Sequence, residues 1–389
     1  MVQRIAGPRL VELGRWYGVV AVTGPRQSGK TTLARTTFRD RPYASLEDPD
    51  TRRFALADPR GFLLQFPDGA VLDEVQRAPE LFSYLQGIVD DDGRCGRWVL
   101  TGSQQFGLVE RITQSLAGRV GFLHLLPFSG QELWATSPPL TLEESLWRGF
   151  YPPVHDRNIP PHVWGADYLT TYVERDVRNV LDIVDLDAFH RFVLSCASRT
   201  GQLVNLTALG ADCGITRNTA AAWLNVLEAS YLVFRLQPWH RNFGKRLTKA
   251  PKLYFLDTGL AAWLAGVRDH AQLLHGAMRG PLFETWVVTE FLKNKRNQLG
   301  TEELYFWRDS AGAEIDLVVE KGDHVALIEC KSGRTVASDW FGTLARVRTL
   351  TGASASAIVF GGEDGQARSD TPVFGWRDIA SVFSAAKVA

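Results

Sequence analysis

One short motif constrains the fold of this 389-residue chain more than any other feature. Residues 24–31 read GPRQSGKT and match GxxxxGK[ST] at every fixed position, between the apolar run GVVAVTG and the helical pattern TTLARTTF. In such a strand–turn–helix unit, the glycines let backbone N–H groups converge on phosphate oxygens, and the helix N-terminus adds a favourable dipole. The motif therefore predicts a phosphate-binding loop in an α/β domain, with a purely structural turn as the alternative.

Each position of this loop has an expected role. We expect Lys30 to reach the β- and γ-phosphates of a nucleotide, and the Thr31 hydroxyl to coordinate Mg²⁺. The residues expected to surround the nucleotide are Gly24, Pro25, Arg26, Gln27, Ser28, Gly29, Lys30, Thr31 and Thr32.

Polar residues follow the next predicted strands. Asp73 and Glu74 end the apolar run AVLDE, the expected place for a Mg²⁺-organising aspartate and a water-activating glutamate, although an acidic pair there is also typical of a solvated turn. Thr101 and Ser103 end a further strand. A polar side chain there has two possible roles: to sense the γ-phosphate or to cap the following helix. Arg119, in SLAGRV, either contacts nucleotide in its own or a neighbouring subunit or forms a surface salt bridge. The neighbouring-subunit alternative predicts a homo-oligomer of unknown size.

Hydrophobic periodicity organises the rest of the chain. The first third alternates short apolar runs with amphipathic stretches, which is typical of a parallel α/β sheet. The strands expected there cover residues 18–24, 70–74, 97–103 and 120–128. A cluster of prolines between residues 136 and 163 then predicts a boundary or hinge.

A helix-turn-helix pattern lies within residues 203–236. We expect one helix over Leu206–Cys213, a turn at Gly214 and a second helix capped by Thr216, followed by a strand in YLVFRL. The remaining pattern predicts a helix over residues 281–296 and strands over 304–307, 314–320 and 325–330.

Several segments together resemble a known family. GPRQSGKTTLA, VLDEVQRAPEL, VLTGS, SLAGRV and LPFSGQEL occur in that order, followed by YVERDV, GQLVNLTALG, KAPKLYFLDTGL and GPLFETWVVTEFL. Over nearly its whole length, the chain is similar to the prokaryotic AAA+-like P-loop ATPases with an uncharacterised C-terminal domain. The resemblance implies ATP and Mg²⁺ as cofactors and gives nucleotide roles to Lys30, Thr31, Asp73 and Glu74, with Arg119 at the position of the family arginine.

The same resemblance implies a fold. The expected class is α/β: a P-loop NTPase with an AAA+-like parallel sheet, then a helical winged-helix domain and a C-terminal α/β domain related to PD-(D/E)xK nucleases. The domains expected are an ATPase domain over residues 1–137, a helical linker or lid over 138–185, a winged-helix domain over 186–268 and a nuclease-like domain over 269–389.

The C-terminal region contains the residue types of a second active site. Asp316 lies in EIDLVV, and Glu329 and Lys331 form an ExK in LIECK, where strand alternation places both side chains on one face. With Glu284 from the preceding helix, the carboxylates would hold Mg²⁺ and Lys331 would support the nucleophilic water, as in a PD-(D/E)xK nuclease. Charged residues are also common at strand ends, and the proline–aspartate pair often seen in that superfamily is missing from the local sequence.

A basic segment favours DNA as a partner. Residues 235–252 contain six basic residues and no acidic one, directly after the helix-turn-helix pattern. We expect Arg241, Lys245, Arg246 and Lys249 to contact phosphates. The alternatives are a solvated basic hairpin and a surface for protein contacts.

Composition excludes some classes of protein. The 43 Lys and Arg residues balance 43 Asp and Glu residues, so the chain is not a uniformly basic nucleic-acid coat. No apolar stretch is long enough for a membrane span, the first 15 residues suit an amphipathic helix, and four dispersed cysteines fit a cytoplasmic protein. Three functions remain: a DNA-associated ATPase, an ATP-regulated Mg²⁺-dependent DNA nuclease, and a nucleotide-dependent protein switch without a DNA role.

Overall fold

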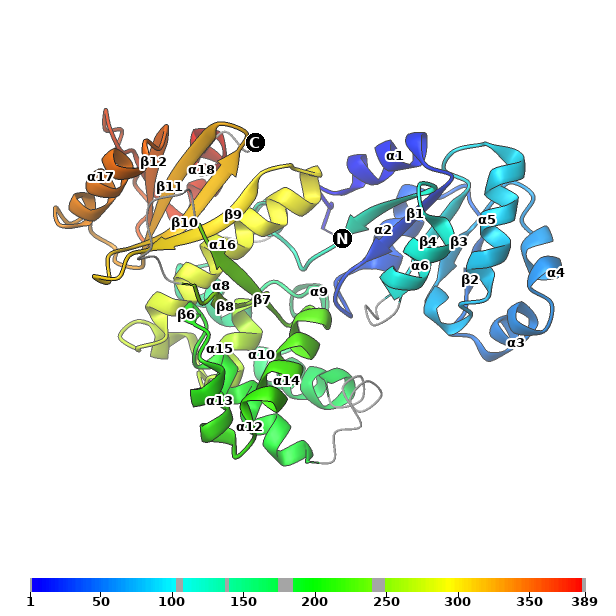
Figure 1. The fold of residues 1–389 in the computed structure, drawn as a ribbon, viewed down its shortest axis with the longest axis horizontal. Helices are drawn as coiled ribbons and strands as arrows, with labels where there is room; N and C mark the ends of the chain where they lie inside the picture. Colours follow the sequence, from blue (N-terminus) through cyan, green and yellow to red (C-terminus); the bar gives the residue numbers. More distant parts are fainter. Residues whose placement is uncertain (1, 103–107, 137–139, 174–184, 240–248, 387–389) are drawn as a thin grey trace. The chain divides into compact units, whose positions relative to one another are not determined.

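The computed structural model describes residues 2–102, 108–136, 140–173, 185–239 and 249–386. The chain forms two compact units, one of residues 1–128 with 296–299 and one of residues 129–295 with 300–389 (Figure 1). No helix in the described parts of the chain is both long and apolar enough to cross a membrane.

The first unit alternates strands and helices around a parallel sheet. Its elements are α1 (Gly7–Trp16), β1 (Val19–Thr23), α2 (Lys30–Thr37), β2 (Tyr43–Ser45), α3 (Pro49–Ala57), α4 (Pro59–Leu64), β3 (Val71–Asp73), a 3₁₀ turn (Val75–Arg77), α5 (Leu81–Asp92), β4 (Trp98–Thr101), α6 (Leu108–Leu116) and β5 (Val120–His124). The strand order is β2-β3-β4-β1-β5, and every neighbouring pair is parallel.

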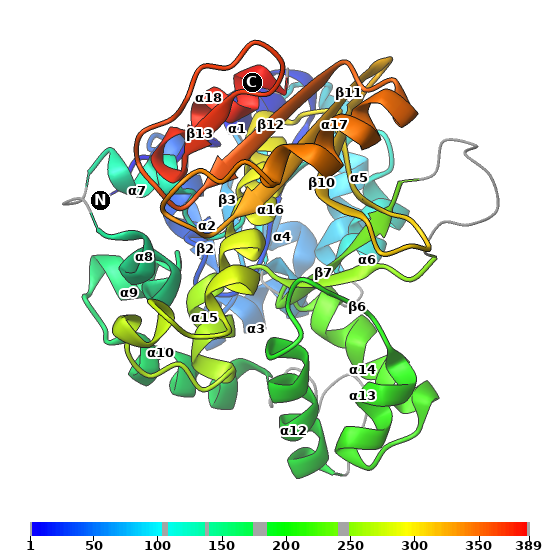
Figure 2. The same cartoon turned by 90° about the vertical axis from the view of Figure 1, so that its left-hand side faces the viewer.

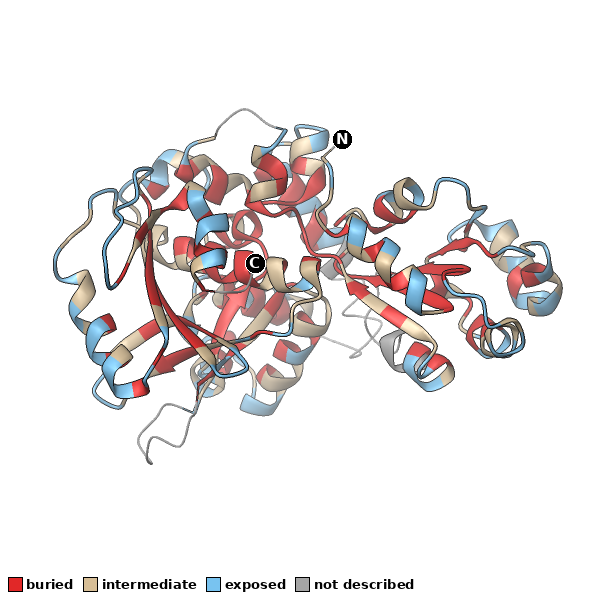
Figure 3. Cartoon of the chain, turned by 90° about the horizontal axis from the view of Figure 1, so that it is seen from above, coloured by how far each residue is buried: buried red, intermediate tan, exposed pale blue. Residues whose placement is uncertain are grey.

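Burial explains why the apolar runs become strands. All residues of β1, β3 and β4 are buried, because helices cover both faces of a parallel sheet (Figure 3). On one face, Leu10 of α1 and Leu33 of α2 pack against Val20 and Val22. The opposite side of β1 presents Val19 and Ala21 to a second core cluster, which includes Leu81 and Leu85 of α5. The predicted strands are confirmed, although the last one ends at His124 rather than at residue 128.

The second unit contains helices and short helical turns along its whole length. They are α7 (Gly130–Trp134), α8 (Leu142–Arg148), α9 (Pro152–Asp156), α10 (Pro161–Tyr168), a π-helical turn (Leu169–Val173), α12 (Leu186–Ala197), α13 (Leu206–Cys213), α14 (Arg217–Ala229), α15 (Thr258–Leu264), a 3₁₀ turn (His270–Leu273), α16 (Arg279–Gln298), α17 (Trp340–Thr351), a 3₁₀ turn (Trp376–Asp378) and α18 (Ile379–Ala385).

The strands of this unit form one sheet. They are β6 (Gln202–Leu203), β7 (Val233–Pro238), β8 (Lys252–Phe255), β9 (Glu303–Arg308), β10 (Glu314–Lys321), β11 (His324–Lys331), β12 (Ala355–Phe360) and β13 (Val373–Gly375). The order is β13-β12-β11-β10-β9-β7-β8-β6, and β7 pairs antiparallel with β8 and parallel with β9. Helix α17 lies along β10, β11 and β12 and contributes Leu344 and Val347 to their core (Figure 2).

The predicted helix-turn-helix elements are confirmed. Gly214 ends α13 with φ +74°, a conformation that glycine adopts without steric cost, and the Thr216 side chain accepts a hydrogen bond from the Thr219 amide at the start of α14. The strand predicted in YLVFRL begins at Val233, because Tyr231 takes a left-handed turn conformation after α14. The helix and the three strands predicted for the C-terminal region are α16, β9, β10 and β11.

Candidate nucleotide-binding site and a second carboxylate cluster

Two glycines in the loop between β1 and α2 take backbone conformations that other residues rarely adopt. Gly24 has φ +144°, and a Cβ there would lie 2.1 Å from the Leu125 carbonyl oxygen, so only glycine fits. Gly29 precedes α2 with φ +93°, another left-handed position. The two glycines thus bend the chain so that the loop leads directly into the N-terminus of α2.

Lys30 lies within this loop rather than in solvent. Its side chain is buried, and its Nζ donates hydrogen bonds to the Pro25 and Gly24 carbonyl oxygens at 2.7 and 3.1 Å. Burial lowers the pKa of Lys30 to about 8, against the opposing charges of Glu74 and Asp73. Near neutral pH, the Lys30 side chain is therefore mostly protonated, and its ammonium group is held at the loop.

Asp73 receives hydrogen bonds from three hydroxyl groups. The Thr31 hydroxyl donates to Oδ1 at 2.9 Å, the Thr101 hydroxyl donates to the same oxygen, and the Tyr43 hydroxyl donates to Oδ2 at 2.9 Å. Strand β4 lies between β1 and β3, which brings Thr101 beside Asp73 at the carboxyl edge of the sheet. Sequence analysis missed Tyr43, because its strand has only three residues and it lies thirty positions from Asp73.

Glu74 follows Asp73 with a left-handed backbone, φ +55°. That conformation is uncommon for a residue with a side chain, and it turns the chain out of β3 into the 3₁₀ turn. The Gln76 side-chain amide donates a hydrogen bond to Glu74 Oε2. The negative charge of Glu74 partly opposes the lowering of the Lys30 pKa, as the charge of Asp73 does. Both acidic residues predicted at this edge therefore lie near the loop.

The residues present fit a magnesium–nucleotide complex. The Ser28 hydroxyl oxygen is fully buried and has no hydrogen-bond partner among the described residues, so it is available to a ligand oxygen. Thr31 and Asp73 offer the oxygen ligands that Mg²⁺ prefers, while Lys30 and the loop amides would hold the phosphates. Bound Mg²⁺ would neutralise phosphate charge, and Glu74 is placed to accept a proton from water.

Arg119 lies at the opposite edge of the sheet. It immediately precedes β5, whose other end, His124, pairs with Thr23 just before the loop. Five residues of strand span roughly 16 Å, so Arg119 does not reach the loop of its own chain. Its guanidinium forms a two-point ion pair with Asp90 on α5, the surface salt bridge that the sequence left open. A contact with nucleotide in a neighbouring copy stays a prediction, and Ser103 falls outside the described residues.

The described basic residues among residues 235–252 lie in different surroundings. Arg235 pairs with Glu228 of α14, and Lys252 is buried among carboxylates, so neither is available to DNA phosphates. Lys249 is exposed. Arg241, Lys245 and Arg246 fall outside the described residues, so their predicted contacts stay predictions.

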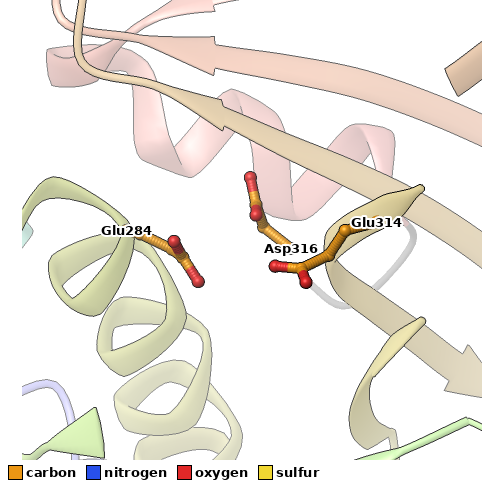
Figure 4. Close-up of side chains that lie close together, drawn as sticks. All are labelled: Glu284, Glu314 and Asp316. Carbon is orange, nitrogen blue, oxygen red and sulfur yellow. The ribbon is translucent and has the colours of Figure 1, made fainter. Parts of the chain in front are cut away.

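A carboxylate cluster lies where the second site was predicted. It contains the predicted Glu284 and Asp316, together with Glu314, which was not predicted. Glu284 of α16 and Glu314 and Asp316 of β10 point toward one another, and one oxygen from each lies within 4.8 Å of the others (Figure 4). Glu314 was missed, although alternation along β10 places it on the same face as Asp316. Lys252 of β8 was also missed. Its Nζ lies 2.7 Å from Glu284 Oε1 and 3.9 Å from Asp316 Oδ1 and forms an ion pair with Glu314.

The predicted ExK residues lie next to this cluster. Lys331 Nζ donates to Glu329 Oε1 at 2.6 Å, while Glu329 Oε2 is buried without a hydrogen-bond partner among the described residues. Burial and the nearby Asp316 raise the pKa of Glu329 to about 8, and burial likewise raises the pKa of Glu284 to about 7. The fold therefore brings all four predicted residues into one region, while their assignment to a nuclease centre stays a prediction.

Comparison with known proteins divides the chain into three matched regions. Residues 17–134 match a family described as an AAA domain, and residues 140–271 and 279–379 match two families described as domains of unknown function, DUF8612 and DUF4143. Among solved structures, the Walker-type ATPase paby2304 of Pyrococcus abyssi is 13% identical, with a TM-score of 0.44 over 67% of this chain and 94% of that one. The RuvB Holliday junction branch migration motor of Thermotoga maritima is 16% identical, with a TM-score of 0.27 over 60% and 90%. At these scores, neither structure bears on the activity.

Two curated proteins are similar over most of their length. The uncharacterized protein Rv2008c of Mycobacterium tuberculosis and the uncharacterized protein Mb2031c of Mycobacterium bovis are each 33% identical over 324 residues, which are 82% of this chain and 71% of each relative. The AAA domain match contains the loop, Asp73 and Glu74. The chain therefore belongs to the family of these mycobacterial proteins, and its first unit is an AAA+-like P-loop ATPase domain.

Proposed function

We propose that this protein is a DNA-associated ATPase that couples Mg²⁺-ATP binding and hydrolysis to remodelling or switching of DNA. The observation that carries the ATPase part is the convergence of Thr31, Thr101 and Tyr43 on Asp73 beside the buried Lys30. An aspartate fixed by three hydroxyls next to a lysine-bearing loop is suited to organising Mg²⁺ and phosphates.

The DNA part is supported by the order of elements in the second unit. Helix α12, β6, α13, α14, β7 and β8 follow one another, and β8 pairs with both β6 and β7. A helix, a short strand, two helices and then two strands, in that order, is the element order expected of a winged helix. In the sequence, Arg241, Lys245, Arg246 and Lys249 lie between β7 and β8.

The start of α14 offers a further residue that we expect to contact DNA and that the sequence analysis did not name. Arg217 and Asn218 are exposed in the first turn after the Thr216 cap. Arg217 forms no salt bridge with any described residue, and the first turn of a second helix is where such motifs contact base edges and phosphates. Arg217 and Lys249 are therefore the described side chains we expect to contact DNA.

The test is ATP turnover measured without DNA and with single-stranded, duplex and four-way-junction DNA. We expect one of these DNAs to stimulate turnover, and Lys30→Ala to lower turnover by about 10²–10³ with or without DNA, because it removes a charge from the reacting phosphates. Turnover that persists in Lys30→Ala would exclude the proposed ATPase site.

DNA binding is tested separately by its salt dependence. Neutralising Arg217 and Lys249 should weaken binding and reduce the slope of log affinity against log salt by about 2. The matched control neutralises two other exposed basic residues, Arg60 and Lys321, and should leave the slope unchanged. If no DNA binds or stimulates while Lys30-dependent turnover remains, the protein is a nucleotide-dependent switch without a DNA role.

A further inference from the structure

Lys252 occupies the space that a metal ion would need in the carboxylate cluster. Its side chain is 2% exposed, and its Nζ lies between Glu284 and Glu314, at 2.7 Å from Glu284 Oε1. Mg²⁺ binds oxygen ligands at about 2.0–2.1 Å, so an ion shared by these carboxylates would lie in contact with the ammonium group. Two like charges at that separation repel strongly in a buried site, so the residues as arranged do not fit a divalent cation.

Other protein groups also donate hydrogen bonds to the cluster. The Tyr254 hydroxyl donates to Glu284 Oε1 at 2.6 Å, and Arg308 Nη1 donates to Glu314 Oε2 at 2.8 Å. The Cys330 backbone amide donates to Asp316 Oδ2 at 2.8 Å. Together with Lys252, these bonds give each of the three carboxylates a protein donor, which lowers the cost of burying them.

The backbone of Lys252 is fixed on both sides. Lys252 pairs with Leu236 of β7 on one side and with Leu203 of β6 on the other. Withdrawing the ammonium group by moving the strand would break the pairing on both sides of β8. The strand pairing therefore fixes the backbone position from which the ammonium group reaches the cluster.

We propose that the Lys252 ammonium group is the resident cation of this cluster, standing where a divalent metal would otherwise bind. The cluster then joins α16, β8 and β10 as an internal ion-pair network. The cluster of Glu284, Glu314 and Asp316 then holds no divalent metal ion. This inference is independent of the proposed ATPase function, because none of its residues belongs to the nucleotide site.

The first test is Mn²⁺ binding by the nucleotide-free full-length protein, measured by calorimetry or by the loss of the free-ion paramagnetic resonance signal. We expect wild type, Glu314→Gln and the exposed control Asp323→Asn to give the same Mn²⁺ isotherm. One Mn²⁺ that is bound by wild type and Asp323→Asn but lost in Glu314→Gln would overturn the proposal. This comparison decides the question even where a Lys252 variant does not fold.

The second test removes the lysine. We expect Lys252→Met to gain one Mn²⁺ site, to melt at a lower temperature than wild type in chelator, and to recover part of that loss when Mn²⁺ is added. Adding Glu284→Gln and Glu314→Gln to Lys252→Met should remove the gained site. A folded Lys252→Met protein, verified by circular dichroism, that gains no Mn²⁺ would contradict the proposal.

Discussion

The Tyr43 hydroxyl donates a hydrogen bond to Asp73 Oδ2 across 2.9 Å, between two neighbouring parallel strands. Burial and the Asp73 charge raise the pKa of Tyr43, so its hydroxyl keeps its proton. The bond leaves Oδ1 to the two threonines and fixes the plane of the carboxylate. Tyr43 is thus a positioning residue for the aspartate expected to organise Mg²⁺.

Tyr43→Phe should weaken the site without dismantling it. Losing one hydrogen bond to a carboxylate typically costs about 1.5–3 kcal/mol, so we expect roughly a 10- to 100-fold rise in the Mg²⁺ concentration needed for half-maximal ATP turnover. Turnover measured against Mg²⁺ concentration checks this, with the exposed Tyr84 on α5 changed to Phe as the control. An unchanged Mg²⁺ requirement in Tyr43→Phe would show that the two threonines suffice.

Glu74→Gln should separate hydrolysis from binding. The amide keeps the size of the side chain but cannot accept a proton from water, so we expect turnover to fall by about 10²–10⁴ while nucleotide affinity stays within a few-fold. Single-turnover hydrolysis and binding of a fluorescent ATP analogue measure the two effects. The exposed Glu80→Gln is the matched control, and equal turnover in both variants would remove Glu74 from the reaction.

Arg119→Ala should behave as the loss of a surface ion pair. Solvent screens exposed pairs, so Arg119→Ala and Asp90→Ala should lower the unfolding free energy by similar small amounts and leave turnover within about two-fold. Thermal melts and turnover across a range of protein concentrations measure this. A large loss of turnover in Arg119→Ala alone, restored by mixing with Lys30→Ala protein, would instead place Arg119 in a neighbouring copy's site.

Acid should destabilise the chain through His124. Its Nδ1 lies 2.8 Å from the Thr23 hydroxyl oxygen, and burial lowers its pKa from 6.5 to about 4. Between these values the unfolded chain binds a proton that the folded chain does not, so the unfolding free energy falls as pH falls through this window. The slope is at most about 1.4 kcal/mol per pH unit.

Urea unfolding from pH 7 to pH 4.5 measures the effect. His124→Asn should show a weaker pH dependence than wild type, whereas the exposed His190→Asn should match wild type. Equal slopes for the two variants would mean that burial does not lower the pKa of His124 in the folded chain.

The nucleotide site was largely predictable from the sequence, and the carboxylate cluster only in part, because Glu284 and Asp316 were predicted but Glu314 and Lys252 were not. The loop, Asp73 and Glu74 lie at strand ends that apolar runs mark clearly, and a parallel sheet brings such ends to one edge. Tyr43 escaped because a three-residue strand has no measurable period. Lys252 was counted in a basic segment interpreted as favouring DNA, because nothing local distinguishes it from Lys249. Its burial depends on α16 and β10, which are distant in sequence.

The pairing of β7 determines where the chain can be cut. A fragment starting at residue 279, where the third family match begins, would lack β7 and β8. Strand β9 would then present an open hydrogen-bonding edge, which favours aggregation. Glu284, Glu314 and Asp316 would also lose their lysine, and uncompensated buried charge is strongly destabilising. A stable, soluble C-terminal fragment must therefore begin before Val233, even though the family boundary lies after it.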